Sequence, residues 1–339
     1  MAIKGYNTGS VSNIAVPALA LKEVLYRAPA FERFSYACSE RKLQEGTSAS
    51  IILTRWINPA VNSNPEPDGT TPVFRTPTYE NFTGTMQRYS EVFAISMQDY
   101  KLSPWDAVEG SIGLLVDLIK RTRERIRQIA AVSGTNIVYN AASITQTTSV
   151  NGPITLGRIQ KGIASIQASK GVPFTKDMGA VDKFNTTPTE AGYFFIHHTD
   201  MCPDIRAFPD FVPLPELASR EGLPPGTWGA DQNTIYISQP EIPISTGAGG
   251  TNSAMRSTNS AVDVYKSCLI AKDALTSIAL EGAEEEGFGN AEIEVLDTPD
   301  KSDPTNSRVL VSAAWFDLCV LTSYDWLVQY QTGATANPA

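Results

Sequence analysis

A single long helix, from Ser103 to Ala131, is the clearest structural signal in this sequence. Ser103 can cap it with its hydroxyl, Pro104 suits the first helical position, and Asp106 lies in the electrically positive first turn. At ~1.5 Å per residue such a helix spans about 40 Å. We therefore expect this segment, the spine helix, to be the backbone of a domain. Apolar residues recur along it at steps of three and four, which predicts one apolar side: Trp105, Val108, Ile112, Leu115, Ile119, Ile126 and Ile129.

The charge is distributed unevenly between the two halves of the chain. Residues 1–150 carry 15 basic and 13 acidic side chains, a net charge of +2, whereas residues 151–339 carry 12 and 23, a net charge of −11. A cationic helix face can neutralise phosphates without reading bases. The alternative is a solvated face partly balanced by Asp117 and Glu124. The basic residues of this face all lie on the spine helix: Lys120, Arg121, Arg123, Arg125 and Arg127.

Two β-rich stretches precede the spine helix, Ser50 to Ile57 and Phe82 to Met97. The polar segment between them, Asn58 to Tyr79, is rich in proline, so the pattern predicts an extended hairpin with a long tip. An isolated two-stranded hairpin is marginally stable in water, so we expect it to need a partner surface. Residues 1–47 show little periodicity beyond a possible short helix at Leu19 to Tyr26, and we expect an arm held by a neighbouring subunit.

The second half of the chain predicts an α+β domain with long loops. Helices are expected at Thr155 to Ser169 and at Ala271 to Leu280, and the segment Ser245 to Ser260 reads as a surface loop. The expected strands are Tyr193 to His198, Thr234 to Ser238, Val264 to Ile270, Ala291 to Leu296 and Arg308 to Leu321.

Residues that could support catalysis or bind a cofactor are few. His197, Asp200 and Cys202 form the one candidate group, but adjacent strand residues point to opposite faces, so a structural role for the histidines is favoured. Neither a Gly-x-Ser-x-Gly elbow nor a complete phosphate-binding loop occurs. The acidic run at residues 284–286 is expected to be a solvated turn rather than a cation site. We therefore expect no cofactor and no metal, with an enzyme of unfamiliar type as the alternative. No apolar run is long enough to predict a membrane span.

The order of parts, an arm, a long hairpin, a spine helix and an α+β domain, resembles the major capsid proteins of tailed bacteriophages with the Hong Kong 97 phage fold. Short motifs narrow the resemblance to the branch found in N4-like podoviruses, and it covers most of residues 48–330. These motifs are Thr85 to Ser90 leading into Ile95-Ser96, Phe195-Ile-His197 followed by Asp204-Ile-Arg206, Ile270 to Ala274, Ala314-Trp315-Phe316, and Asp325-Trp326-Leu327.

The resemblance implies a division into domains. Residues 1–47 would be the N-terminal arm and 48–100 the extended loop that lies across a neighbour. Residues 101–150 with 291–319 would form the peripheral domain, and 151–290 with 320–339 the axial domain. The spine helix would run along the inner side of the shell, which would turn its basic residues toward packaged DNA.

The resemblance also implies a structural, non-enzymatic function. The chain would assemble into the hexamers and pentamers of an icosahedral head shell, in the cytoplasm of a bacterial host, and become the virion capsid. Portal, scaffolding and decoration proteins would be its partners. An encapsulin-like compartment, which stores cargo instead of a genome, is the alternative. Some relatives join subunits by an isopeptide bond from a lysine on the extended loop, but no lysine occurs here between Lys42 and Lys101, so we expect no such bond.

Overall fold

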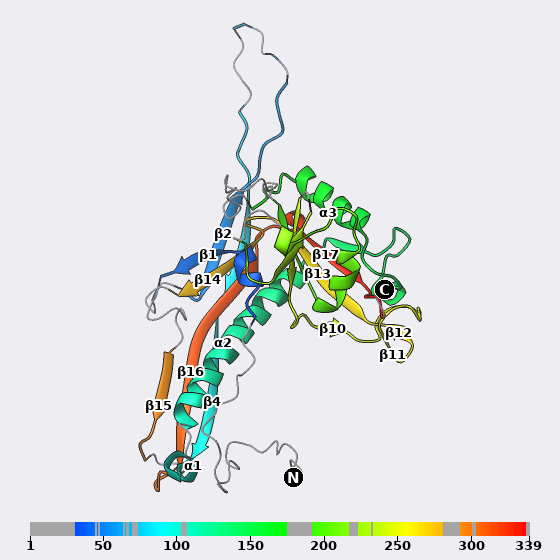
Figure 1. Cartoon of the computed structure of the whole chain (residues 1–339). Helices are drawn as coiled ribbons and strands as arrows, with labels where there is room; N and C mark the ends of the chain where they lie inside the picture. Colours follow the sequence, from blue (N-terminus) through cyan, green and yellow to red (C-terminus); the bar gives the residue numbers. More distant parts are fainter. Residues whose placement is uncertain are drawn as a thin grey trace.

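The computed structural model describes residues 31–44, 46, 48–63, 65, 68–69, 74–102, 107–174, 192–216, 223–231, 233–280, 292–299 and 303–336. These residues form a narrow, elongated part, a broader lobe, and a hairpin that projects beyond both (Figure 1). Helices and sheets occur together in each half of the chain, so the predicted α+β class is confirmed.

The elongated part is a five-stranded sheet built around β16 (Arg308–Leu321). β16 pairs antiparallel with β4 (Gln87–Ser96), β15 (Glu292–Leu296) and β14 (Leu275–Leu280), and β1 (Cys38–Leu43) pairs parallel with β14. Side chains of a strand alternate between its faces, and in β16 Val309, Val311, Ala313 and Trp315 are the buried set. They pack with Ile95 of β4 under the spine helix. The short helix α1 (Met97–Leu102) ends this part.

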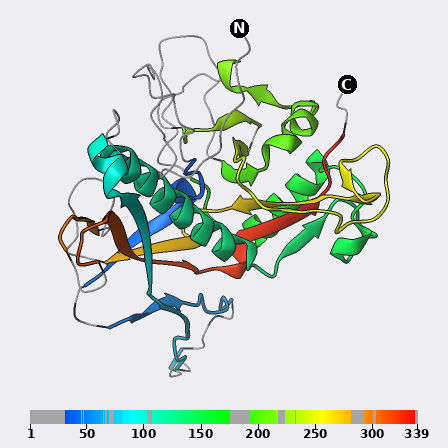
Figure 2. The same cartoon turned by 90° about the horizontal axis from the view of Figure 1, so that it is seen from below.

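The spine helix is α2 (Ala107–Val132), and it runs from the elongated sheet to the lobe (Figure 2). The predicted cap and first turn, Ser103 to Asp106, lie outside the described residues. Leu115 and Ile119 are buried as predicted, but the apolar stripe was wrong at the C-terminal end, because Ile129 is 58% exposed. The buried side there carries Glu124, Arg127, Gln128 and Ala131.

The change of buried side has a physical reason. At about 100° per residue, Ala131 lies about 120° around the helix from Ile119. The first turns of α2 face β4 and β16, whereas Ala131 belongs to the core shared with the lobe strands. One helix therefore serves two cores, and its apolar side rotates between them.

The lobe contains an eight-stranded sheet in the order β5-β17-β13-β6-β9-β8-β7, with β10 also paired to β13. α3 (Leu156–Ala168) packs on the lobe core through Ile159, Ile163 and Ile166. The short helix α4 (Cys202–Arg206) follows β6. The strands are β5 (Ile137–Tyr139), β6 (Tyr193–His197), β7 (Val212–Pro213), β8 (Thr227–Ala230), β9 (Thr234–Ser238), β10 (Ile244–Ser245), β13 (Val264–Ile270) and β17 (Leu327–Thr332), with a separate pair, β11 (Ser257–Thr258) and β12 (Ala261–Val262).

The predicted helix at Ala271 to Leu280 was wrong. Residues 275–280 form β14, and a turn with Asp273 at φ 61° precedes it. β14 lies between β1 and β16, so both of its edges are hydrogen-bonded. Pairing with strands distant in the sequence outweighs the local helical pattern. The other strands predicted in this half of the chain are confirmed, and so is the helix at 155–169.

The predicted hairpin is shorter than expected. β2 (Ser50–Trp56) pairs antiparallel with β3 (Tyr79–Thr85), but the chain then turns at Met86 and β4 joins β16 of the same chain. The expectation that the whole second strand, 82–97, lacks a partner in its own subunit was therefore wrong for β4. Only β2, β3 and their tip project from the body.

The expectation of a weakly buried arm at residues 1–47 was wrong for residues 31–43. Phe34 and Ala37 of the 3₁₀ turn η2 (Phe34–Ala37) are 1% exposed, and β1 extends the elongated sheet. Residues 1–30, including the predicted helix at Leu19 to Tyr26, lie outside the described residues. The five-stranded sheet contains β1, β4 and β14 together with β16, whereas β5 belongs to the eight-stranded sheet of the lobe. These strands come from different predicted domain ranges. The domain ranges remain a prediction.

Candidate functional site

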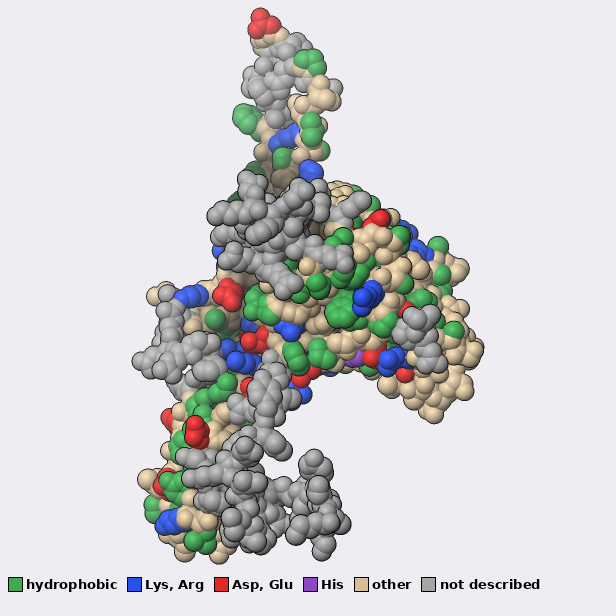
Figure 3. All heavy atoms as spheres, viewed as in Figure 1, with side chains coloured by type: hydrophobic (Ala, Val, Ile, Leu, Met, Phe, Trp, Pro, Cys, Tyr) green, Lys and Arg blue, Asp and Glu red, His purple; other side chains and the backbone are tan. Residues whose placement is uncertain are grey.

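The projecting hairpin exposes large apolar side chains. Trp56 and Tyr79 are 65% and 57% exposed, and their rings meet edge to face with centroids 5.6 Å apart. Further along the tip, Val61 and Phe74 are more than nine-tenths exposed, at 92% and 93%. Figure 3 shows apolar side chains at several separate places along the projection. Exposed aromatic residues gathered on a projecting element are typical of a contact surface for another protein, so the hairpin is a candidate for one.

The five basic residues of α2 do not share one exposed face. The side chains of Arg121 and Arg125 are exposed: Arg121 forms an ion pair with Glu241 at 2.8 Å, and Arg125 donates to Gln128 Oε1 at 2.7 Å. Lys120 and Arg123 are half-buried, and Arg127 is buried. The prediction of one cationic face was therefore wrong for Arg127. Contact with DNA stays a prediction for Lys120, Arg121, Arg123 and Arg125.

Four charged residues form a cluster between α2 and β16, which we call the buried charge cluster: Arg123, Glu124, Arg127 and Asp317. Burial raises the pKa of Asp317, and the charges of Arg127 and Arg123 oppose that rise. Burial by itself lowers the pKa of Arg127. The nearby groups Cys38, Asp317 and Glu124 raise it by more than burial lowers it, so the pKa of Arg127 is raised overall. Both Arg127 and Asp317 are thus held in a buried environment where each charge depends on the other.

Glu124 anchors the start of the described chain to α2. Its Oε1 accepts hydrogen bonds from the backbone N–H of Arg33 at 2.6 Å and of Phe34 at 2.7 Å, where η2 begins. Gln239 Nε2 donates to the same oxygen at 3.3 Å and to the carbonyl of Phe31 at 2.9 Å. Burial raises the pKa of Glu124, although these backbone bonds act against the rise. The carboxylate therefore has a structural role, in contrast to the solvated role that the sequence suggested.

The candidate catalytic group does not present a reactive nucleophile. Burial raises the pKa of the Cys202 thiol to about 11, so the thiol is protonated at neutral pH. Asp200 accepts from Tyr265 Oη at 2.9 Å and lies 3.1 Å from Arg256 Nη1. His197 is fully buried, and its Nδ1 donates to the carbonyl of His198 at 2.9 Å. Within the described part of the chain, no three His, Cys, Asp or Glu residues are grouped to hold a metal ion.

His197 predicts acid sensitivity of the unassembled subunit. Burial lowers its pKa to about 4, whereas an unfolded histidine titrates near ~6.5. Because the folded state binds this proton less readily, its stabilising effect is complete above about pH 6.5 and is lost as the pH falls toward about 4, for a total of about 3 kcal/mol. Urea unfolding at a series of pH values measures the loss.

His197→Asn is the matched control, because its amide can still donate to the His198 carbonyl but does not titrate. The raised pKa values of Glu124 and Asp317 act in the opposite direction and are common to both proteins. The difference between the two pH profiles therefore isolates His197. Parallel profiles would contradict the prediction.

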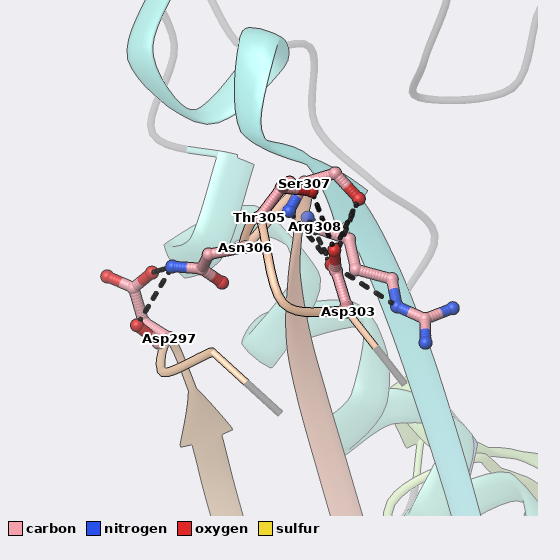
Figure 4. Close-up of polar contacts among 6 residues, drawn as sticks. All are labelled: Asp297, Asp303, Thr305, Asn306, Ser307 and Arg308. Atoms are coloured by element: carbon pink, nitrogen blue, oxygen red, sulfur yellow. Dashed lines mark hydrogen bonds and ion pairs between the residues drawn. The ribbon is translucent and has the colours of Figure 1, made fainter. Parts of the chain in front are cut away.

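A rigid corner closes the far end of the elongated sheet, in the loop between β15 and β16 (Figure 4). Asp303 accepts from the backbone N–H of Ser307 at 2.8 Å and of Arg308 at 3.2 Å, and these bonds, led by Ser307, lower its pKa. Asn306 Nδ2 donates to the carbonyl and the carboxylate of Asp297, both at 3.1 Å. These bonds lie within the described part of the loop and hold the turn from which β16 begins.

Comparison with solved structures identifies the fold. The chain superimposes on the capsid of cyanophage Pam1 with a TM-score of 0.64 and 11% identity, covering 99% of this chain and 100% of that one. The match to the capsid of Ralstonia phage GP4 has a TM-score of 0.62 and 9% identity, and it covers 99% of this chain and 100% of that one. The match to the head structure of Helicobacter pylori bacteriophage KHP40 has a TM-score of 0.57 and 14% identity, and it covers 98% of each chain. The chain has the Hong Kong 97 phage capsid fold.

The Hong Kong 97 fold confirms the architecture that the order of sequence elements predicted. No protein-family model and no curated protein sequence matches the chain, so the likeness lies in the three-dimensional structure. At these identities the match establishes the fold, and the function is a separate inference. None of the described helices has both the length and the apolar character needed to cross a membrane.

Proposed function

We propose that this chain is a major capsid protein, a structural protein without enzymatic activity that forms the head shell of a tailed phage. The observation that carries the proposal is the extent of the match: the alignments cover 98% to 99% of this chain and 98% to 100% of the solved capsid chains. The short sequence motifs support the finer proposal that the phage belongs to the N4-like podovirus branch.

The geometry supports assembly through the hairpin. Interfaces of obligate assemblies bury on the order of 2,000 Å² or more. We propose that the hairpin, within the extended loop 48–100, supplies part of this area by lying across a neighbouring subunit. The peripheral domain (101–150 with 291–319) and the axial domain (151–290 with 320–339) would supply the remaining contacts within hexamers and pentamers.

The proposed partners follow from the proposed assembly. Portal, scaffolding and decoration proteins would guide or stabilise the shell, which assembles in the host cytoplasm, and packaged double-stranded DNA would lie against its inner surface. The exposed part of α2 gives such DNA a cationic surface to contact without base recognition.

Expression of the chain, alone and with a scaffolding partner, tests the function. We expect large closed or tubular particles in negative-stain microscopy. A stable monomer under both conditions would refute the capsid proposal. Closed particles that retain a cargo enzyme instead of nucleic acid would favour the encapsulin-like alternative.

The DNA contact makes a separate prediction. Changing Arg121 and Arg125 to glutamine is expected to leave shells intact but to lower DNA retention at every salt concentration, because two phosphate-neutralising charges are lost. Glu241→Gln is the matched control, since it breaks the ion pair with Arg121 but keeps the cation. Retained DNA is measured per particle across a salt series. Equal retention in the double variant and the wild type would show that this surface is only solvated.

A further inference from the structure

The hairpin is joined to the lobe by one arginine held between aromatic rings. Arg55 of β2 places its Cζ 5.5 Å from the ring centre of Phe82 on β3 and 5.3 Å from that of Trp326. Trp326 belongs to the 3₁₀ turn η6 (Tyr324–Trp326), which directly follows β16. The guanidinium is also fixed by Glu80, whose Oε2 lies 2.9 Å from Arg55 Nη2. A flat cation held between two rings and a carboxylate has few available orientations.

The tryptophan is a rigid support for this contact. Trp326 Nε1 donates to the carbonyl of Ser169 at 2.9 Å, just beyond the end of α3. The backbone carbonyl of Trp326 accepts from Ala271 N at 3.0 Å. The lobe therefore holds the indole by one hydrogen bond and the backbone of Trp326 by another, and movement of the hairpin at this level requires Arg55 to leave the indole.

A second contact lies nearer the body. A Cβ atom on Gly84 of β3 would come within 2.6 Å of Val320 Cγ2 and 2.9 Å of Leu318 Cδ2, so only glycine lets the strand approach β16 this closely. Gly84 pairs with Ile51 and Arg55 with Glu80. At ~3.3 Å per residue the two levels are about 13 Å apart along β2. Between these levels the rings of Phe82 and Tyr324 lie with centroids 6.4 Å apart. Contacts at different heights set a direction, and that of Arg55 with Trp326 lies farther along the hairpin than those of Gly84 and Phe82.

We propose that Arg55 is a positioning residue whose contact with Trp326 fixes the angle at which the hairpin leaves the subunit. Immediately beyond it, Trp56 and Ile57 are exposed, so the fixed direction is passed to the part of the hairpin that meets other proteins. Without this contact the hairpin is held at the levels of Gly84 and Phe82 and tilts more freely about them, while β2 and β3 stay paired.

Distance measurements between spin labels test the proposal on unassembled subunits, and so do not depend on the capsid function. Labels at Thr78 on the hairpin and Lys161 on α3 report its angle. We expect one narrow distance distribution in the wild type, at least a doubling of its width in Arg55→Gln, and an intermediate width in Arg55→Lys. The urea midpoint of the body should not change.

Arg75→Gln is the matched control, because Arg75 lies on the same hairpin but donates to Ala60 within the tip, at 2.7 Å. It should leave the Thr78–Lys161 distribution narrow. A wild-type distribution in Arg55→Gln would overturn the proposal, and so would equal broadening in both variants.

Discussion

Arg127→Leu is expected to destabilise the unassembled subunit by less than the cost of a broken buried ion pair, about 3 to 5 kcal/mol, because Arg127 acts on Asp317 through space and not through a direct ion pair. Arg127 is 9% exposed and Asp317 is 5% exposed, so water cannot replace the lost guanidinium. The carboxylate of Asp317, and that of Glu124, would then lose the cation that offsets their burial. Chemical unfolding of the subunit measures the change.

The double variant Arg127→Leu, Asp317→Leu separates charge from packing. Removing both charges avoids the unpaired carboxylate, so the double variant should be more stable than Arg127→Leu alone. Arg125→Gln, on the exposed side of the same helix, is the control and should stay within about 0.5 kcal/mol of the wild type. If the double variant were less stable than Arg127→Leu, the loss of stability in the single variant would not come from an unpaired carboxylate at Asp317.

Removing the hairpin tip is expected to abolish assembly while leaving the subunit folded. The variant lacks residues 58–77 and joins Ile57 to Thr78, which lie opposite each other, through an Asn-Gly turn that suits a two-residue hairpin connection. Because Val61 and Phe74 are almost fully exposed, their loss removes no core contact of the subunit. Thermal unfolding should be nearly unchanged, and size-exclusion chromatography should show subunits without particles.

A graded variant supports the deletion. Changing Val61 and Phe74 to serine keeps the length of the tip but removes its apolar side chains, so we expect fewer particles than in the wild type. Particles of normal yield after the deletion would show that the tip is not needed for assembly. Failure of the shortened subunit to fold would show that the tip belongs to its own core.

The elements that the sequence predicted correctly are those whose signal is local. The apolar run in Arg308 to Leu321 and the helical spacing of Ile159, Ile163 and Ile166 are each contained within one segment, so the local sequence reveals these elements. β14 was missed because the strands that pair with it, β1 and β16, lie far away in the sequence. The split of the second hairpin strand at Met86 also depends on β16.

The buried charge cluster could not be predicted for the same reason. In the sequence, Arg123 and Arg127 are one turn apart and resemble a solvated helix face. Only the structure brings Asp317 of β16 beneath them. One signal was available: Asp317 is a single acidic residue within an otherwise apolar strand, and an isolated charge at a buried position requires a partner.

The central position of β16 has a consequence for the order of folding during synthesis. Cys38 pairs with Leu275, and Ser96 pairs with Arg308, each across more than 200 residues of chain. Loop closure over such distances slows folding, and the ribosome delivers β16 near the end of translation. Until then β4 and the first turns of α2 lack the strand on which they pack, and β14, which pairs with β1, lacks its other neighbour. The elongated part of the subunit therefore forms only after almost the whole chain has been made.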